Sequence, residues 1–327
     1  MIQLLLTGLF ALIILTAVAA PLESLGWWAG WFGERGRGRP QDDAHPLPSA
    51  PPNSSSHYLI YLSGIGAITD DSLPKEELAW LAALEPALPG TELVRDVFPY
   101  SVTNVGLTGN RVFARVYRRL ERLRLKNEGS ILAATINLRN MFQVLVSADP
   151  RYGPIYSKGV ADAIVDVLQR LGYRVGSGTP VTLLGWSGGA QVALGTVSFL
   201  SQLLRAPIRV VSIGGVLSDD PGLRHITHVY HFYGDRDPIQ AVGSKIYAGR
   251  WRMFPQSNWN RAMAQGKIDM VSLGPLVHNG TGNYFDWTTR APDGRPYAQV
   301  TIDAICAALR RDGLLDERSP GVPPARA

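Results

Sequence analysis

The chain has 327 residues, of which 46% are hydrophobic and 18% charged, and its formal net charge is +5. This length and composition are typical of one large α/β domain or two small ones with a sizeable core. The positive charge is mild and is not interleaved with aromatic residues, which argues against a nucleic-acid partner. The single cysteine, Cys306, excludes a disulfide framework. No Cys/His spacing is typical of a metal site, and we expect no metal and no cofactor.

The first 22 residues contain no charged side chain, and residues 4–20 are almost wholly apolar. About 20 such residues span a hydrocarbon core as a helix. The apolar stretch is followed by a cluster of tryptophans, Trp27, Trp28 and Trp31, and then by several arginines. This pattern is typical of a membrane interface with a positive cytoplasmic flank. We therefore predict a transmembrane anchor over residues 1–22. The protein is then a single-pass protein of the cell membrane with its folded domain in the cytoplasm.

A cleaved signal peptide is the alternative interpretation of residues 1–22. Ala17-Val18-Ala19 offers a cleavage site, although the basic region that usually opens a signal peptide is absent. In that case the mature protein is secreted. Residues 23–56 are rich in proline towards their end and are predicted to form an extended linker. His57, at the edge of this linker, is expected to be exposed to solvent.

Alternating strands and helices occupy residues 57–316, which we predict to be one folded domain, followed by a disordered tail over residues 317–327. Apolar and β-branched runs predict strands over 57–62, 91–98, 181–184, 208–214, 226–233 and 267–274. Helical patterns cover 74–88, 111–125, 155–171, a run ending near 204, and 300–311. This alternation predicts an α/β fold with a mostly parallel central sheet and helices on both faces.

Residues 105–172 are long for a single connection between two strands. We interpret part of this stretch as an insertion that lies over the functional site as a lid. Residues 130–149 within it are apolar and do not favour either helix or strand. The helix predicted over 111–125 has a dense basic face, which we expect to be solvated, with contact to anionic lipid headgroups as the alternative.

The sequence Gly185-Trp186-Ser187-Gly188-Gly189 lies between a predicted strand and a predicted helix and fits the pattern G-x-S-x-G. In this context the serine lies on a turn so tight that glycine is needed on both sides. The backbone N–H of Gly188 is expected to point towards a developing oxyanion. The turn after the first strand contains Ile65, whose N–H is predicted to be the second oxyanion donor, with an ordinary glycine-rich turn as the alternative.

A serine hydroxyl is a poor nucleophile unless a base accepts its proton and an acid orients the base. Asp237 follows the fifth predicted strand and His278 follows the sixth. Because the carboxyl ends of parallel strands meet at one edge of a sheet, we expect Ser187, Asp237 and His278 to lie together. Asp235 and Asp219 are alternatives to Asp237, which is preferred for its spacing from the glycine at the strand end.

The tight turn around Ser187, called a nucleophile elbow, and the chain order of serine, aspartate and histidine resemble the α/β-hydrolase family. The resemblance covers about residues 58–314. The resemblance implies that Ser187 is the nucleophile, His278 the general base and acid, and Asp237 the partner that orients the histidine. It also implies an oxyanion hole made by the N–H groups of Ile65 and Gly188. The implied fold is the α/β-hydrolase fold, preceded here by the N-terminal transmembrane helix.

The chain departs from that family at Ser63-Gly64, where His-Gly is common, and it has no HGGG-type run. The resemblance implies a serine hydrolase that cleaves an ester-type carbonyl of a small molecule or a lipid through an acyl-enzyme. A catalytically silent protein of the same fold, binding a lipid or another protein, is the alternative. The aromatic residues around His278 are candidates either for an acyl pocket or for anchoring loops: Trp251, Trp259, Tyr284 and Trp287.

Overall fold

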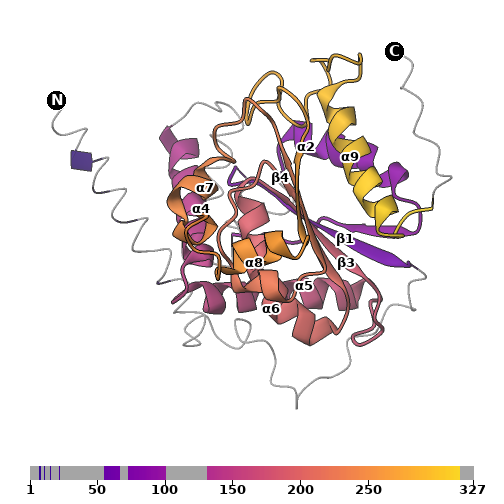
Figure 1. The fold of residues 1–327 in the computed structure, drawn as a ribbon. Helices are drawn as coiled ribbons and strands as arrows, with labels where there is room; N and C mark the ends of the chain where they lie inside the picture. The colour runs from indigo at the N-terminus through magenta and orange to yellow at the C-terminus, as the bar shows by residue number, and fades with distance from the viewer. Residues whose placement is uncertain are drawn as a thin grey trace.

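The computed structural model describes residues 55–66, 73–100 and 131–316, together with residues 7, 8, 11, 15 and 22. Within these residues, six strands form one sheet in the order β2-β1-β3-β4-β5-β6, and every neighbouring pair is parallel. The strands are β1 (His57–Leu62), β2 (Thr91–Val94), β3 (Val181–Trp186), β4 (Ile208–Ile213), β5 (His228–Tyr233) and β6 (Ile268–Ser272). The predicted α/β architecture with a parallel central sheet is thus confirmed (Figure 1).

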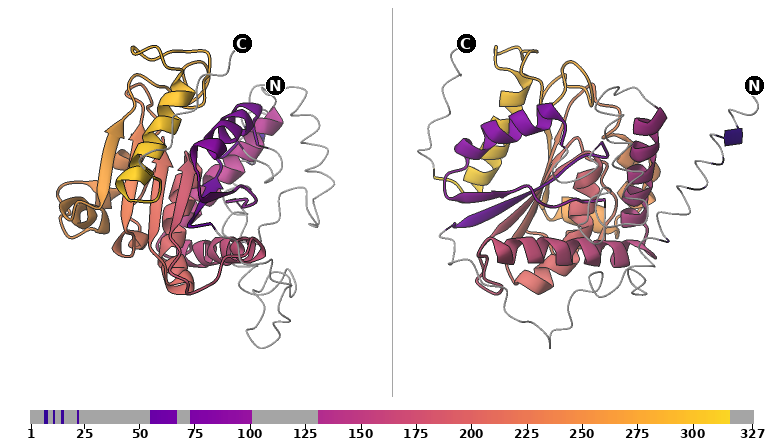
Figure 2. Two further views of the ribbon diagram at one scale, coloured as in Figure 1. Left: turned by 90° about the vertical axis from the view of Figure 1, so that its right-hand side faces the viewer. Right: turned by 180° about the vertical axis from the view of Figure 1, so that it is seen from behind.

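Helices cover both faces of the sheet. Figures 1 and 2 show α2 (Lys75–Leu84) and α9 (Tyr297–Arg311) on one face. The other face carries α4 (Ile131–Ala148), α5 (Gly153–Arg170) and α6 (Gly188–Leu204). The shorter elements are α7 (Val242–Ile246), α8 (Asn258–Ala264) and the single turns η1 (Glu85–Ala87), η2 (Pro221–Arg224) and η3 (Ala248–Arg250). Every residue of β1 and β3 is buried, as expected for parallel strands covered on both faces.

The strand order reverses between β1 and β3. The chain passes from β1 outwards to β2, and then returns across β1 to pair β3 with its other side. In open α/β sheets, ligands bind in the crevice at the carboxyl ends of the strands where such a reversal occurs. Ile65 follows β1 and Ser187 follows β3, so two of the predicted site residues lie at this position.

Two predicted elements differ from the structure. The strand predicted over 91–98 ends at Val94, because β2 pairs only with the first four residues of β1. Val97 and Phe98 are nevertheless buried, in the connection that follows. The apolar residues 130–149 form the helix α4, which packs on α6 and α5. The described part of 105–172 is therefore two regular helices of the sheet's outer layer.

No helix in the described part of the chain is long and apolar enough to cross a membrane. The anchor predicted over 1–22 lies outside the described residues except for the isolated positions given above. Nearly all of the linker over 23–56, the basic helix over 111–125 and the tail over 317–327 also lie outside them.

The expectation that His57 is exposed is wrong. This residue begins β1 and is fully buried, and its Nδ1 lies 3.0 Å from Thr91 Oγ1. Its Nε2 lies 2.8 Å from Thr182 Oγ1 on β3. Burial, followed by the charge of Arg209, lowers the pKa of His57 to about 3. The ring is therefore neutral at neutral pH and joins three neighbouring strands at the start of the sheet.

Candidate active site

The serine of the G-x-S-x-G pattern adopts a strained backbone conformation between β3 and α6. Ser187 has φ of 51° and ψ of −119°, a region that non-glycine residues rarely adopt. A Cβ on Gly185 would lie 2.3 Å from Ala190 Cα, and one on Gly189 would lie 2.3 Å from the Leu62 carbonyl oxygen. Glycine is needed on both sides because the turn brings backbone against backbone.

Three side chains from three strand ends form one chain of hydrogen bonds. Ser187 Oγ lies 2.8 Å from His278 Nε2. His278 Nδ1 lies 2.8 Å from Asp237 Oδ2. The exposed fraction is only 7% for Ser187, 7% for His278 and 3% for Asp237. Low exposure strengthens the electrostatic coupling between these groups, because little water screens it. The structure thus brings the three predicted side chains together in the order serine, histidine and aspartate.

The Asp237 carboxylate is held by four donors. Oδ1 accepts hydrogen bonds from the backbone N–H groups of Ile239 at 2.8 Å and Gln240 at 3.3 Å. Oδ2 accepts the hydroxyl of Tyr284 at 2.7 Å in addition to His278. Burial alone raises the pKa of Asp237, but the hydrogen bonds from His278 and Tyr284 outweigh it and leave the pKa below its usual value. The carboxylate therefore stays ionised and can stabilise a positively charged imidazole.

Tyr284 is a member of this network and not a pocket-lining residue. Its ring is fully buried, and its hydroxyl also accepts the backbone N–H of Gly234 at 2.7 Å. Burial, together with the negative charge of Asp237, raises the pKa of Tyr284. The phenol stays protonated and donates its single proton in the hydrogen bond to Asp237. Nothing in the local sequence indicates this role, because the hydroxyl reaches the aspartate only after the chain has folded.

The two alternative acids lie elsewhere. Asp235 is exposed, and its Oδ1 accepts the hydroxyl of Ser272 at 2.6 Å. Asp219 Oδ1 accepts the backbone N–H of Trp259 at 2.6 Å, at the start of α8. Among the described contacts of His278, the carboxylate is that of Asp237.

Trp186, directly before the serine, packs against the histidine. Its ring is stacked on that of His278, with the centroids 4.5 Å apart. It meets the rings of Tyr284 and Phe285 edge-on at 5.2 Å and 5.1 Å. A Cβ on Gly64 would lie 2.6 Å from the indole, so the turn after β1 also packs closely on it. This aromatic cluster packs against one face of the imidazole and so restricts the orientation of the His278 ring.

The two predicted oxyanion donors are neighbours. A Cβ on Gly188 would lie 2.9 Å from Ile65 Cγ2. The turn that contains Ile65 is held by Asn140 Nδ2, which donates to the Ile65 carbonyl at 2.7 Å, and by the Tyr100 hydroxyl, which donates to the Ser63 carbonyl at 2.7 Å. Within the described residues, neither the Ile65 nor the Gly188 N–H has a backbone acceptor. An N–H group without a backbone acceptor can donate to an oxyanion.

Helix α4 borders the site beside Ile65 and Gly188. It contributes Asn140 beneath the Ile65 turn, and a Cβ on Gly188 would lie 2.6 Å from Val144 Cγ2. In the described part of the predicted lid, α4 therefore packs against one side of the site, beside Ile65 and Gly188. Asn140 and Tyr100 were not predicted as site residues, because nothing in their local sequence indicates which loop they support.

The other three aromatic candidates for an acyl pocket lie in different environments. Trp259 is buried beneath the guanidinium of Arg250, whose Cζ lies 3.8 Å from the ring centroid. Trp251 and Trp287 are 42% and 37% exposed. Together with the position of Tyr284, this arrangement favours the loop-anchoring alternative over a common acyl pocket.

Among the residues that the structure describes, no group of three or more His, Cys, Asp or Glu side chains is placed to bind a metal ion. No protein-family model matches the chain. A search of curated proteins finds no relative. Membership of the α/β-hydrolase family is therefore a proposal that depends on the residues and geometry described above.

Proposed function

We propose that this protein is a serine hydrolase with the α/β-hydrolase fold, which cleaves an ester-type carbonyl through an acyl-enzyme on Ser187. The observation that carries the proposal is the continuous chain of 2.8 Å hydrogen bonds from Ser187 through His278 to Asp237. Its location at the strand-order reversal, next to two available backbone N–H groups, supports the same interpretation.

In the first step, Ser187 Oγ attacks the carbonyl carbon while its proton passes to His278 Nε2. The carbonyl oxygen becomes an oxyanion, which the N–H groups of Ile65 and Gly188 stabilise. Asp237 stabilises the imidazolium that forms. When the carbon–oxygen bond to the leaving group breaks, His278 returns the proton to the departing alkoxide, and an alcohol leaves the acyl-enzyme.

In the second step, His278 takes a proton from water, and the resulting hydroxide attacks the acyl carbon. The tetrahedral intermediate collapses, Ser187 recovers its proton from His278, and a carboxylic acid is released. The substrate that we propose is an acyl ester of a small molecule or a lipid. A lipid is favoured by the apolar residues 1–22, through which we propose that the protein is attached to the cell membrane.

The test is labelling of the full-length protein, purified in detergent, with a fluorophosphonate that forms a covalent bond to an activated serine. We expect labelling of the wild type and none of Ser187→Ala. We expect the labelling rate of His278→Ala to fall by about 10⁴-fold or more, because members of a triad act as a unit.

Ser212 offers a matched control. It is a second buried serine next to a histidine, with its Oγ 2.9 Å from His231 Nδ1. The variant Ser212→Ala should be labelled like the wild type. If the folded wild type is not labelled, the hydrolase proposal fails, and a silent protein that binds a lipid or a partner becomes the better interpretation.

A further inference from the structure

The segment that follows Asp237 combines positive charge with a complete lack of acidic residues. Residues 238–268 contain no aspartate or glutamate. They contain five cationic residues, which are Lys245, Arg250, Arg252, Arg261 and Lys267. In a chain whose net charge is only +5, this is a strong local excess.

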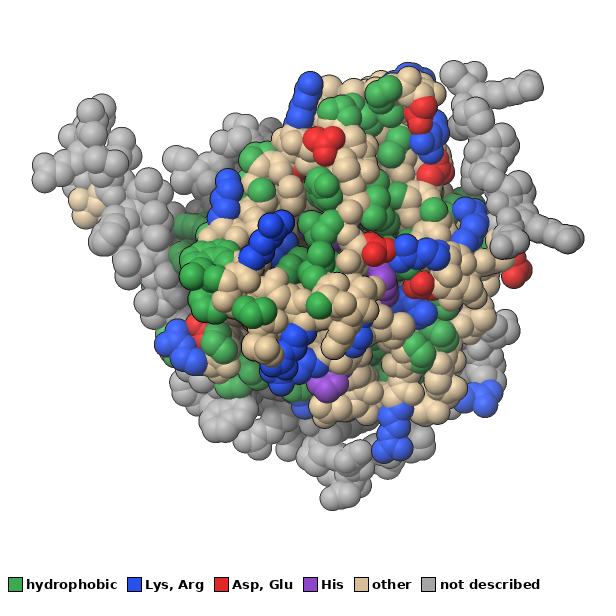
Figure 3. Space-filling model, viewed as in Figure 1, with side chains coloured by type: hydrophobic (Ala, Val, Ile, Leu, Met, Phe, Trp, Pro, Cys, Tyr) green, Lys and Arg blue, Asp and Glu red, His purple; other side chains and the backbone are tan. Residues whose placement is uncertain are grey.

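The same segment exposes large apolar side chains. Of the fourteen exposed large hydrophobic side chains in the described residues, six belong to it. They are Ile239, Ile246, Trp251, Met253, Phe254 and Met263. Met253 is 72% exposed and Ile246 is 51% exposed. Figure 3 shows hydrophobic, lysine and arginine side chains side by side over the region of α7 and α8. Such a mixture is unusual on a surface that faces only water.

The exposure is built into the loop by specific hydrogen bonds. Asn260 Nδ2 donates to the carbonyls of Gly249, Trp251 and Phe254 at 3.3, 2.8 and 2.9 Å. Trp251 Nε1 donates to the Ser244 carbonyl at 3.0 Å, and the Trp251 and Phe254 rings lie 6.3 Å apart. These contacts fix the backbone of the loop and the indole of Trp251, and in this arrangement Trp251 and Phe254 are 42% and 44% exposed.

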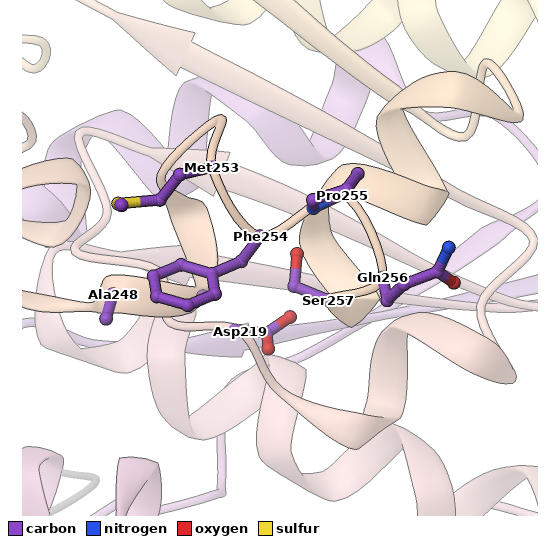
Figure 4. Close-up of a pocket in the computed structure, with 8 residues that line it drawn as sticks. Asp219, Ala248, Met253, Phe254, Pro255, Gln256 and Ser257 are labelled. Carbon is purple, nitrogen blue, oxygen red and sulfur yellow. The ribbon is translucent and has the colours of Figure 1, made fainter.

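The residues of this loop line an open surface hollow of about 530 Å³. Figure 4 shows Met253 and Phe254 on one side of it and Pro255 and Gln256 on the other. Asp219 is the one acidic residue among its lining residues, and it is already engaged with the start of α8.

We propose that Lys245, Ile246, Trp251, Arg252, Met253 and Phe254, here called the 245–254 surface, dock on a bilayer that contains anionic phospholipids. Aromatic and aliphatic side chains enter the interfacial region, and the cations contact the negative headgroups. The charge excess fits anionic lipid, and the exposed aliphatic side chains favour a bilayer over a nucleic acid. The segment that carries this surface begins directly after Asp237, whose carboxylate accepts the backbone N–H groups of Ile239 and Gln240. The inference does not depend on catalysis.

The test places a polarity-sensitive label on the surface of the full-length protein, reconstituted with vesicles. Met253→Cys is labelled with bimane. Cys306 is buried, and burial raises its pKa to about 11, so it stays unlabelled. Gln169→Cys, at an exposed position near the end of α5, is the control site. We expect a blue shift at position 253, and none at 169, with phosphatidylcholine–phosphatidylglycerol vesicles and little shift with phosphatidylcholine alone.

The charge requirement is tested by Lys245→Gln/Arg252→Gln in the labelled background. Each removed charge should lower the ratio of docked to undocked label by about five-fold. Arg170→Gln/Arg174→Gln removes two exposed cations from the other end of the domain and should have little effect. Equal shifts at 253 in neutral and anionic vesicles, no shift in either, or an equal shift with a lipid-free oligonucleotide would each overturn the proposal.

Discussion

The imidazole of His278 is stacked on the indole of Trp186, with ring planes inclined by only 23°. An aromatic face stabilises a nearby cation by about 0.5–2 kcal/mol. In the proposed reaction this histidine is cationic in both tetrahedral intermediates, so the stacking favours those states over the resting enzyme.

Replacement of this indole should therefore slow the chemical step. We expect Trp186→Leu to lower kcat by about 2- to 30-fold, which is the range that the cation–π contribution gives. The acid limb of the kcat/KM profile should move to lower pH, because the protonated imidazole is less stabilised. Trp186→Phe should recover part of both effects. A Trp186→Leu enzyme that is less stable but has the wild-type pH profile would show that the stacking is only structural.

Removal of the Tyr284 hydroxyl should affect both stability and rate. Tyr284→Phe takes a donor from Asp237 and an acceptor from the Gly234 N–H. A hydrogen bond to a charged group contributes about 1.5–3 kcal/mol, so we expect a loss of that order in the free energy of unfolding. We also expect a decrease in kcat, and a shift of the acid limb to higher pH, because Asp237 then interacts more strongly with His278. Denaturant unfolding and pH–rate profiles measure these effects.

Tyr173→Phe is the matched control for that substitution. The Tyr173 hydroxyl donates to the Thr179 carbonyl at 3.0 Å, in the connection before β3 and away from the strand ends that carry the site. Its loss should lower stability and leave kcat unchanged. Equal loss of kcat in both variants would argue against a positioning role for Tyr284.

The elbow should not tolerate a methyl group after the serine. In Gly189→Ala, the new Cβ meets the Leu62 carbonyl oxygen at 2.3 Å, and backbone on both sides leaves no flexible neighbour to yield. We expect a loss of about 3 kcal/mol or more in the free energy of unfolding, or no soluble protein. Gly176→Ala is the control, since a Cβ there has open space and the cost is that of its φ of +80°, about 1–2 kcal/mol. Similar losses in the two variants would contradict the steric argument.

Acid should destabilise the fold through His57. Its folded pKa of about 3 lies below the unfolded value of 6.5, so the unfolded chain binds a proton that the folded chain excludes. The resulting stability is fully present above pH 6.5 and is lost as the pH falls towards about 3. At about 1.4 kcal/mol per pH unit, this amounts to a few kcal/mol. His231, with a pKa of about 4 from burial, adds a contribution of the same sign.

Urea unfolding at several pH values between 7.5 and 4 measures this slope. His57→Gln keeps a group that can hydrogen-bond to Thr91 and Thr182 but does not titrate. Its stability should therefore fall less steeply with acid than that of the wild type. An unchanged slope would mean that the buried ring is not the group that binds the proton.

Most of the sheet could be predicted because its strands are short apolar runs bounded by glycine, proline or polar residues. Residues 57–62 and 208–213 illustrate this well. The strand predicted over 91–98 is too long. Val97 and Phe98 are apolar and buried, so their sequence resembles the end of a strand, but they lie in the connection that leaves the sheet after Val94. The exposure of His57 was predicted wrongly because its partners lie 34 and 125 residues away.

The candidate triad could be predicted because parallel strands present their carboxyl ends at one edge, so position in sequence implies position in space. Ser187, Asp237 and His278 each follow a strand that could be identified. Tyr284 and Asn140 could not be predicted, because their contacts with Asp237 and Ile65 depend on tertiary packing and leave no periodic pattern.

The serine–histidine bond joins residues 91 positions apart, and the histidine–aspartate bond joins residues 41 positions apart. Ser187, Asp237 and His278 follow β3, β5 and β6, so the complete chain of hydrogen bonds exists only when these three strands have assembled. A reactive serine would therefore serve as a reporter of complete folding. The rate at which a refolding sample regains fluorophosphonate labelling would measure how fast these strands assemble, with no label built into the protein.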